Sequence, residues 1–234
     1  MRAVITFHSI DARRGPLSYP PRDLAALLAT LVATRVPLLD LDTLLSPATT
    51  RGVTLTFDDG MRSVLDAALP VLREHRAPAH LFLATGLIEP TAAARSGCEM
   101  LTWDGVVQLA RAGVAIEGHT HGHPDLRRLA DEDVDAQCER ADALIEQRIG
   151  RRPRYFAYPF GHHDARVAGR IAARYAAAFT TRLGFLSADA VASRLPRIDA
   201  HYLRGAHARR PLASPATRAW LAARKVLRRV RGSE

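Results

Sequence analysis

Short strand-like segments alternate with helix-like segments along almost the whole chain, and this alternation limits the folds that the chain can adopt. The strand-like segments are residues 3–7, 52–57, 79–85, 114–117, 154–158, 177–181 and 195–200. The segments between them repeat their apolar residues with a period near 3.6, as helices do. Each helix returns the chain to the same end of the sheet, so the strands are predicted to run parallel. Closure into one α/β barrel is the simplest way to bury such a sheet.

The composition of the 234 residues excludes several classes of protein. Hydrophobic residues make up 47% and charged residues 24%, which excludes an intrinsically disordered chain. No apolar run approaches the roughly 18 residues of a membrane-spanning helix, and the N-terminal residues lack the features of a secretory signal. The only cysteines are Cys98 and Cys138, so a disulfide framework is not expected. We therefore predict a soluble, cytoplasmic, single-domain protein.

The formal net charge of +9 is concentrated in the C-terminal segment. Nine Arg and Lys residues lie after residue 203 and face a single acidic residue, Glu234, whereas residues 1–203 are almost neutral. We therefore divide the chain into a barrel of residues 1–203 and a basic tail or helix of residues 204–234. The neutral barrel argues against nucleic acid as a partner, because nucleic-acid binding calls for a basic face on the folded domain.

Two interpretations of the basic tail stay open. Its apolar residues recur at helical spacing, with arginines between them: Ala216, Trp220, Ala223, Leu227 and Val230. Such a helix can lie on an anionic membrane surface or on an acidic partner. Alternatively, it docks on the barrel through Trp220 and Leu227 and turns a solvated arginine face outward.

Chemically active residues follow four of the predicted strands. His8 follows the first strand, Asp58 and Asp59 follow the second, the histidine-rich segment 118–124 follows the fourth, and residues 159–161 follow the fifth. The carboxyl ends of barrel strands converge on one face, where barrel enzymes build their active sites. We therefore expect these residues to share one pocket.

The residue types in this predicted pocket suit a catalytic metal. His119 and His123 are four positions apart and can reach one ion from a single loop. Two imidazoles with one carboxylate leave a position open for water, as in catalytic zinc sites, although cobalt, nickel or iron would accept the same ligands. A cation also removes the cost of placing two carboxylates side by side. Taken singly, the Asp pair could be a strand-ending turn and the His segment a surface loop, but together they favour a metal.

Three segments resemble the motifs of the polysaccharide deacetylase family, also known as the NodB homology domain or carbohydrate esterase family 4. Residues 56–60, Thr-Phe-Asp-Asp-Gly, resemble the first motif, residues 119–124 the second and residues 156–161 the third. The resemblance covers nearly everything except the basic tail. It implies a distorted (β/α)7 barrel that removes an N-acetyl group from an amino sugar with the help of a divalent metal. The early strand that ends at His8 is similar to the exopolysaccharide-biosynthesis type.

The resemblance also implies residue roles. Asp59, His119 and His123 would bind the metal, and Asp58 would be the general base for the water that attacks the amide carbonyl. The backbone N–H of Phe160, beside Tyr158 and Pro159 in the third motif, would stabilise the oxyanion on the substrate side of the site. In this register His121 would point away from the metal.

The sequence departs from the family pattern at two places. The third motif has Ala157 where the family usually has an Arg that holds the catalytic Asp. Arg197 could supply this cation to Asp58, or it could form an ordinary surface salt bridge. No Leu-x-x-His motif lies near the C-terminus, so we expect His8 to be the general acid, with His201 as the alternative.

We therefore expect a cytoplasmic N-deacetylase acting on a GlcNAc-type glycan or glycoconjugate precursor. A nucleotide-linked or lipid-linked sugar at the inner membrane face is the favoured substrate, and the basic tail could provide peripheral membrane contact. His162 and His163 follow the third motif and are candidates for lining the sugar site. Two other functions stay open, namely a related amidohydrolase acting on non-sugar C–N bonds and a catalytically silent barrel that serves as a binding module.

Overall fold

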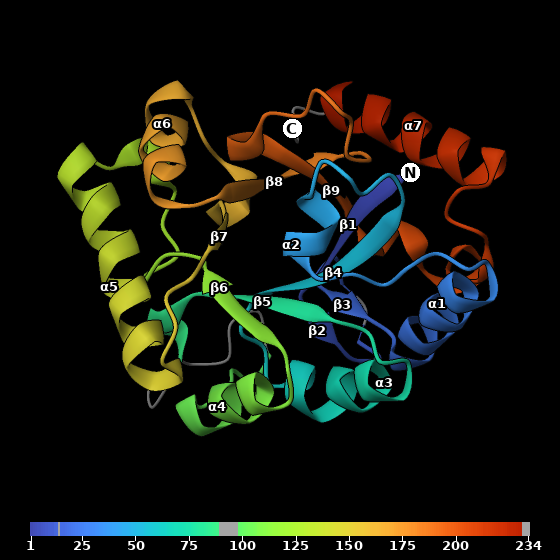
Figure 1. Cartoon of the computed structure of the whole chain (residues 1–234), viewed down its shortest axis with the longest axis horizontal. Coiled ribbons are helices and arrows are strands. Elements are labelled where there is room, and N and C mark those ends of the chain that lie inside the picture. Colours follow the sequence, from blue (N-terminus) through green and yellow to red (C-terminus); the bar gives the residue numbers. More distant parts are fainter. Residues whose placement is uncertain (14, 89–97, 231–234) are drawn as a thin grey trace.

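Seven parallel strands close into a barrel in which the strands follow one another in chain order (Figure 1). The structure is a computed structural model that describes residues 1–13, 15–88 and 98–230. The barrel strands are β1 (Arg2–Phe7), β4 (Gly52–Asp59), β5 (Ala79–Leu83), β6 (Ala115–Gly118), β7 (Tyr155–Ala157), β8 (Ala177–Leu183) and β9 (Leu195–Asp199). The predicted seven-stranded α/β barrel is confirmed.

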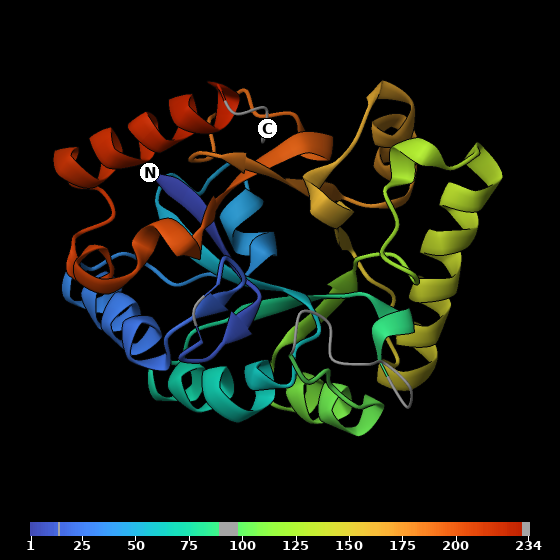
Figure 2. The ribbon, with the colours of Figure 1, turned by 180° about the vertical axis from the view of Figure 1, so that it is seen from behind.

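Apart from the short helix Leu41–Leu45, the helices lie around the outside of the barrel (Figures 1 and 2). That short helix packs with Leu41 and Leu44 against a buried cluster that includes Val4 and Phe82. The described helices are α1 (Pro21–Ala33), α2 (Leu41–Leu45), α3 (Leu69–Glu74), α4 (Trp103–Arg111), α5 (Asp131–Ile149), α6 (Ala165–Arg174) and α7 (Pro215–Val230). In α1 four leucines at helical spacing are all buried, namely Leu24, Leu27, Leu28 and Leu31, and they form the face that the helical period turns toward the core. A separate small sheet consists of β2 (Ser9–Ile10) and β3 (Ser18–Tyr19).

The barrel is unevenly paired around its circumference. β1 and β4 pair through six residues each, whereas β6 and β7 pair only at Gly118 and Phe156. β8 and β9 also shift register between Phe179 and Leu183. These irregularities distort the barrel, while β4 stays buried along its whole length because helices cover its outer face.

The end of the second predicted strand moves in the structure. Asp58 and Asp59 do not follow β4 but form its last two residues. Helix α5 begins at Asp131, and Ala130 occupies its cap position. The helical stretch around residue 70 is divided into a π-helical turn, Val64–Ala68, and α3. Pro70 lacks the N–H that an unbroken α-helix would need there.

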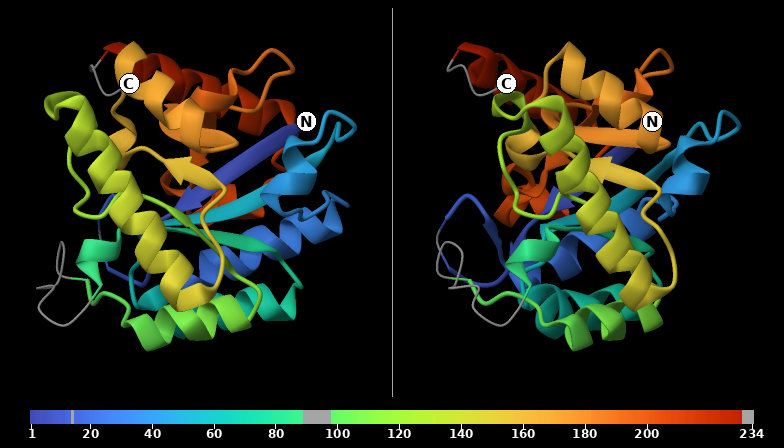
Figure 3. Two further views of the ribbon diagram at one scale, coloured as in Figure 1. Left: turned by 60° about the vertical axis from the view of Figure 1, so that its left-hand side comes forward. Right: turned by 90° about the vertical axis from the view of Figure 1, so that its left-hand side faces the viewer.

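The C-terminal helix α7 packs against the outside of the barrel, beside β8 and the start of β1 (Figures 1 and 3). Leu212 and Leu221 belong to the same core cluster as the barrel residues, and the Trp220 Nε1–H donates to the Tyr202 carbonyl oxygen at 3.1 Å. Leu227, in contrast, is 44% exposed, so the expectation that it docks on the barrel is wrong. Within residues 1–13, 15–88 and 98–230, no helix is long and apolar enough to cross a membrane.

Candidate metal centre and active site

A buried carboxylate and two buried imidazoles meet at the carboxyl end of the barrel. Asp59 is the last residue of β4, and His119 and His123 lie in the loop that follows β6. The Asp59 Oδ1 atom lies 3.3 Å from His119 Nε2 and 3.2 Å from His123 Nε2. The potential ligand atoms of the three residues all lie within 4.8 Å of one another. The structure therefore brings together the three residues predicted to bind a metal.

The chemistry of these donors fits a divalent cation. His119 Nδ1 lies 2.7 Å from the Ala157 carbonyl oxygen, which can only accept, so Nδ1 donates. In the neutral ring the lone pair of Nε2 then faces the Asp59 carboxylate, and two acceptors attract each other only through a cation between them. Tetrahedral zinc with bonds of about 2.0–2.1 Å would separate neighbouring ligand atoms by about 3.3 Å. The contacts of Asp59 match that spacing.

Unusual backbone conformations shape the metal-binding side. Asp59 has φ 74° and His123 has φ 56°, both in the left-handed region that few non-glycine residues adopt. Adjacent side chains on a regular strand point to opposite faces, so Asp58 and Asp59 would be separated without this turn. Burial raises the pKa of each carboxyl, but polar and charged neighbours outweigh it, and the imidazoles of His119 and His8 help to lower both pKa values. Both carboxylates thus lie near the same histidines.

Arg197 holds the Asp58 carboxylate through two hydrogen bonds. Arg197 Nη1 lies 2.8 Å from Asp58 Oδ1 and Nη2 lies 2.7 Å from Oδ2, while Nε donates to the Thr180 carbonyl oxygen at 3.1 Å. The Arg197 residue is only 1% exposed, so the alternative of a surface salt bridge is wrong. Burial alone would raise the pKa of the Asp58 carboxyl, but the guanidinium lowers it below its usual value. Asp58 is therefore held as a carboxylate.

His8 lies at this end of the barrel, whereas His201 has other neighbours. The partly buried His8 directly follows β1, and its imidazole contributes to lowering the pKa of both Asp58 and Asp59. The exposed His201 packs edge-on against Tyr202, with 5.6 Å between ring centroids. Burial and the nearby Arg204 lower the pKa of His201. Of the two histidines weighed as general acid, the structure places His8 beside the carboxylates.

The third motif contributes Phe160 to the site and directs Tyr158 elsewhere. The exposed Phe160 has φ 60°, and its ring packs edge-on against His123 with 4.6 Å between centroids. The Tyr158 N–H donates to the Phe179 carbonyl oxygen at 3.0 Å, and its hydroxyl donates to the Ser193 carbonyl oxygen at 2.9 Å. Pro159 has no N–H. The oxyanion role of the Phe160 backbone N–H stays a prediction.

The other histidines named from the sequence make separate contacts. His121 Nδ1 lies 2.9 Å from the Thr85 hydroxyl, in keeping with a side chain that does not join the metal cluster. His162 Nδ1 lies 3.1 Å from Asp125 Oδ2, and His163 Nδ1 lies 3.1 Å from the Gly161 carbonyl oxygen. Sequence reasoning missed the carbonyl group of Ala157 that orients His119. No side-chain signal marks it, because every residue has a carbonyl group.

The family model for polysaccharide deacetylases matches residues 46–178, which is more than half of the chain and includes Asp58, Asp59, both predicted metal-binding histidines and the third motif. The chain belongs to the polysaccharide deacetylase family. The type within the family, predicted as exopolysaccharide biosynthesis, stays a prediction.

Two curated relatives of this family member align with part of its sequence. A chitooligosaccharide deacetylase of Azorhizobium caulinodans is 32% identical over 115 residues, which are 48% of this chain and 50% of that protein. The protein YlxY of Bacillus subtilis, described as uncharacterized, is 29% identical over 97 residues, 42% of this chain and 27% of that protein. The chain therefore spans between about a quarter and a half of the length of these relatives.

Solved structures share the barrel of this polysaccharide deacetylase family member. The Streptococcus pyogenes deacetylase PplD in complex with acetate has a TM-score of 0.77 and 22% identity, over 93% of this chain and 96% of that chain. IcaB from Ammonifex degensii has a TM-score of 0.75 and 21% identity, over 89% of this chain and 97% of that chain. These similarities extend the common fold beyond residues 46–178 to most of the chain.

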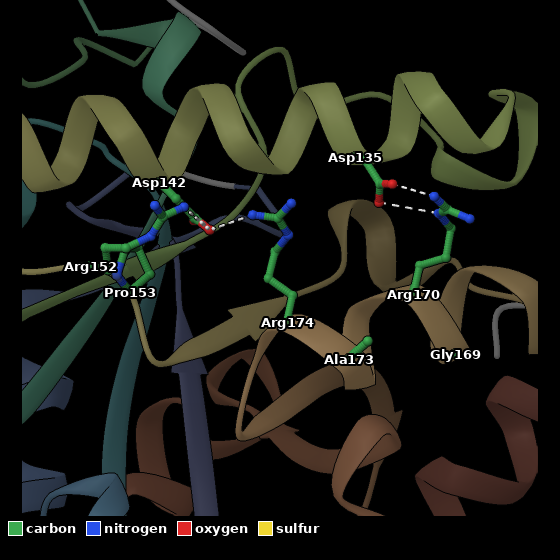
Figure 4. Close-up of a pocket in the computed structure, with 8 residues that line it drawn as sticks. All are labelled: Asp135, Asp142, Arg152, Pro153, Gly169, Arg170, Ala173 and Arg174. Atoms are coloured by element: carbon green, nitrogen blue, oxygen red, sulfur yellow. Dashed lines mark hydrogen bonds and ion pairs between the residues drawn. The ribbon is translucent and has the colours of Figure 1, made fainter.

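A wide cleft of about 880 Å³ lies apart from the metal-binding residues, between α5 and α6 (Figure 4). Its walls include oppositely charged side chains that pair with each other across the two helices, such as Arg170 with Asp135. None of the residues that line this cleft belongs to the metal cluster. Its size alone does not make it the active site.

Proposed function

We propose that this chain is a metal-dependent N-deacetylase that acts on an acetylated amino sugar of the GlcNAc type. The observation that carries the proposal is the buried Asp59–His119–His123 cluster beside an Asp58 carboxylate held by Arg197. Membership of the polysaccharide deacetylase family supports this reaction, as does the similarity to a relative named chitooligosaccharide deacetylase. Zinc is the favoured ion, because two imidazoles and one carboxylate are a common catalytic zinc set.

The reaction replaces the amide C–N bond by a C–O bond to water. When bound, the divalent ion would polarise the carbonyl group and acidify water. Asp58 accepts a proton from the attacking water, a role that suits a carboxylate kept ionised by Arg197. The backbone N–H of Phe160 stabilises the negative charge that develops on the carbonyl oxygen. The products are the free amine and acetate.

His8 protonates the leaving nitrogen in this proposal. The amine is a poor leaving group until it gains a proton, and an imidazole can supply one near neutral pH. His8 suits this role because it lies beside the carboxylates and is only partly buried, so that a substrate can reach it. One proton thus leaves water through Asp58 and one reaches nitrogen through His8.

The proposal is tested by measuring metal content together with acetate release. Wild-type protein purified without a chelator or a histidine tag should hold about one equivalent of divalent metal. Asp59→Ala should lose both the metal and the activity, because it removes a ligand. Asp58→Asn should keep the metal while kcat falls by a factor of about 10²–10⁴, because it removes only the base.

The partly buried His75, at the end of α3, provides a matched control, since His75→Ala should change neither readout. His8→Ala should keep the metal and lower kcat. His201→Ala should keep the metal and leave kcat unchanged. The proposal is wrong if the wild-type protein takes up no zinc, cobalt, nickel or iron, or if Asp58→Asn turns over at the wild-type rate. A panel of N-acetylated sugars and non-sugar amides separates the sugar deacetylase from the amidohydrolase alternative.

The silent binding module loses its main sequence argument. A family member that lacks an Arg at position 157 could be inactive, but here Arg197 provides the two-point contact to Asp58 from another strand. The nucleotide-linked or lipid-linked form of the sugar stays a prediction. A comparison of acetate release from free, nucleotide-linked and lipid-linked N-acetylglucosamine would test it.

A further inference from the structure

Helix α7 presents a stripe of apolar residues to the solvent. Ala219, Ala222, Ala223, Val226 and Leu227 are all exposed, and they follow the i, i+3, i+4, i+7, i+8 spacing of a single helix face. Val226 is 59% exposed and Leu227 is 44% exposed, which places both among the most exposed large hydrophobic residues of the described chain. An apolar stripe on a helix of a globular protein normally faces the core. We call these five residues the α7 stripe.

The opposite face of α7 already holds the helix on the barrel. Thr217 and Leu221 are buried, and Trp220 donates to the Tyr202 carbonyl oxygen and stacks on His207 with 4.5 Å between ring centroids. Figure 2 shows α7 running along the outer side of the molecule. The α7 stripe therefore stays on the surface while the inner face remains docked.

The charge of α7 is entirely basic. Its sixteen residues include five Arg or Lys residues and no acidic residue. Arg218 is exposed and the half-buried Lys225 lies on the same flank of the α7 stripe, seven positions further along the helix. A helix with an apolar face and a basic flank suits the boundary between the headgroups and acyl chains of an anionic bilayer.

We propose that the α7 stripe inserts into the surface of a membrane that contains anionic lipids, with the helix axis parallel to the bilayer. This proposal goes beyond the deacetylase function and does not depend on it. It also makes the two interpretations of the tail compatible. One face of α7 docks on the barrel, and the exposed face of the same helix binds the membrane. A second copy of the chain is a poorer occupant, since an antiparallel two-fold packing of the two helices would bring the Arg218 and Lys225 flanks of both copies together.

The test is sedimentation of the full chain with vesicles of phosphatidylcholine alone or mixed with phosphatidylglycerol. The wild-type protein should bind the anionic vesicles, bind the neutral vesicles weakly, and dissociate in high salt. Val226→Ser with Leu227→Ser should reduce the partition coefficient about tenfold or more, because it removes the two largest inserted side chains. Arg218→Gln with Lys225→Gln should reduce it by roughly fivefold for each charge.

Matched controls use equally exposed valines elsewhere. Val32 is 52% exposed and Val191 is 49% exposed, so Val32→Ser with Val191→Ser removes similar apolar surface away from α7 and should leave binding unchanged. Circular dichroism and metal content verify that each variant is folded. The proposal is overturned if the wild-type protein ignores anionic vesicles, or if the α7 and control variants lose binding equally. It is also overturned if light scattering shows that the α7 stripe holds two copies together and the vesicles remain unbound.

Discussion

Arg197 and Asp58 are 139 positions apart in the sequence, yet their side chains form a two-point ion pair inside the barrel. Arg197 lies on β9 and Asp58 on β4, two strands that both neighbour β1. Ala157 on β7 has no charged group, so the positive charge beside Asp58 comes from another strand. A guanidinium presents two parallel donors, so it can hold a carboxylate in one orientation as well as keep it charged.

Replacing Arg197 should affect stability and activity together. Arg197→Met leaves a buried carboxylate without its partner, and we expect the free energy of unfolding to fall by about 3–5 kcal/mol. Acetate release should fall as well, because Asp58 then binds a proton more tightly. Urea unfolding and kcat measure the two effects.

Two further variants separate charge from orientation. Arg197→Lys should restore part of the stability but less of kcat, because an ammonium cannot make the two-point contact. The double variant Asp58→Asn with Arg197→Met should be more stable than Arg197→Met alone, because no carboxylate is left unpaired. Equal stability of Arg197→Met and the wild-type protein would contradict the role assigned to this pair.

At the scale of elements, the short turn after β7 depends on Gly161. Gly161 has φ 73°, and a Cβ atom at this position would lie 2.6 Å from the Thr181 N atom. The turn needs a residue that tolerates this conformation and this close approach. Phe160, immediately before it, is thereby held against His123.

Gly161→Ala and Gly169→Ala should have opposite effects on stability. Gly161→Ala should lower the free energy of unfolding by about 1–3 kcal/mol and also lower kcat, because Phe160 must shift. Gly169 lies inside α6, where an added Cβ would meet nothing within 4 Å, so Gly169→Ala should stabilise the protein by about 0.5–1 kcal/mol. Thermal and urea unfolding compare the two variants. A Gly161→Ala protein as stable and active as the wild type would show that the turn tolerates a side chain.

The contact between α5 and α6 contains a buried acid with a raised pKa. Asp142 accepts a hydrogen bond from the Tyr175 hydroxyl at 2.9 Å and faces Arg174 at 3.4 Å and Arg152 at 3.7 Å (Figure 4 shows both arginines). Burial raises the pKa of Asp142 to about 6, more than these partners lower it. Between pH 4 and 6 the folded protein thus keeps a proton that the unfolded chain has lost.

This raised pKa predicts a pH-dependent stability. The contribution of Asp142 to the free energy of unfolding is fully present below pH 4. It is lost as the pH rises through 6, because the folded state must then hold a poorly solvated carboxylate. Relative to Asp142→Asn, the wild-type protein should lose up to about 3 kcal/mol of stability between pH 4 and 7. Urea unfolding at several pH values measures the difference.

Asp135 provides a control of opposite sign on the same helix. Its hydrogen bond to Arg170 lowers its pKa, so its contribution is present above pH 4 and is lost as the pH falls. The Asp135→Asn variant should therefore approach the wild-type stability at low pH rather than at high pH. If the difference in stability between the wild-type protein and Asp142→Asn stayed constant between pH 4 and 7, the raised pKa assigned to Asp142 would be contradicted.

At the scale of the whole molecule, the barrel closes through strand pairing that does not involve the proposed metal. Chelation should therefore lower the melting temperature without unfolding the protein. At a metal concentration of about 100 times Kd, binding adds about 2.7 kcal/mol of stability, or about 5–10 °C for a chain of this size. Differential scanning fluorimetry with and without chelator measures this shift.

The Asp59→Ala variant is the control for this measurement. It lacks a proposed ligand, so its melting temperature should not respond to chelator or to added zinc. An equal shift in the wild-type protein and in Asp59→Ala would mean that the metal binds elsewhere. The cytoplasmic location of the protein stays a prediction.

Local periodicity in the sequence was enough to predict the seven strands, the helices between them and their closure into a barrel. The same pattern predicted that Asp58, Asp59 and the histidine-rich segment 118–124 share one pocket, because the carboxyl ends of parallel strands converge whatever side chains they carry. The choice of Asp59 to bind the metal with His119 and His123 came from the family resemblance. The strands, the helices and the shared pocket follow from hydrophobic period and chain direction, both of which are properties of short segments.

Other features depend on contacts between distant segments, and only the tertiary structure decided them. The sequence left open whether Arg197 reaches Asp58 or the surface, and it did not indicate the positive φ of Asp59 that places both carboxylates near His119. One of the two open interpretations of the tail placed Leu227 against the barrel, whereas Leu221 and Thr217 pack there instead. A helical period identifies an apolar face, but which of two faces is buried depends on the surface that the rest of the fold presents to the helix.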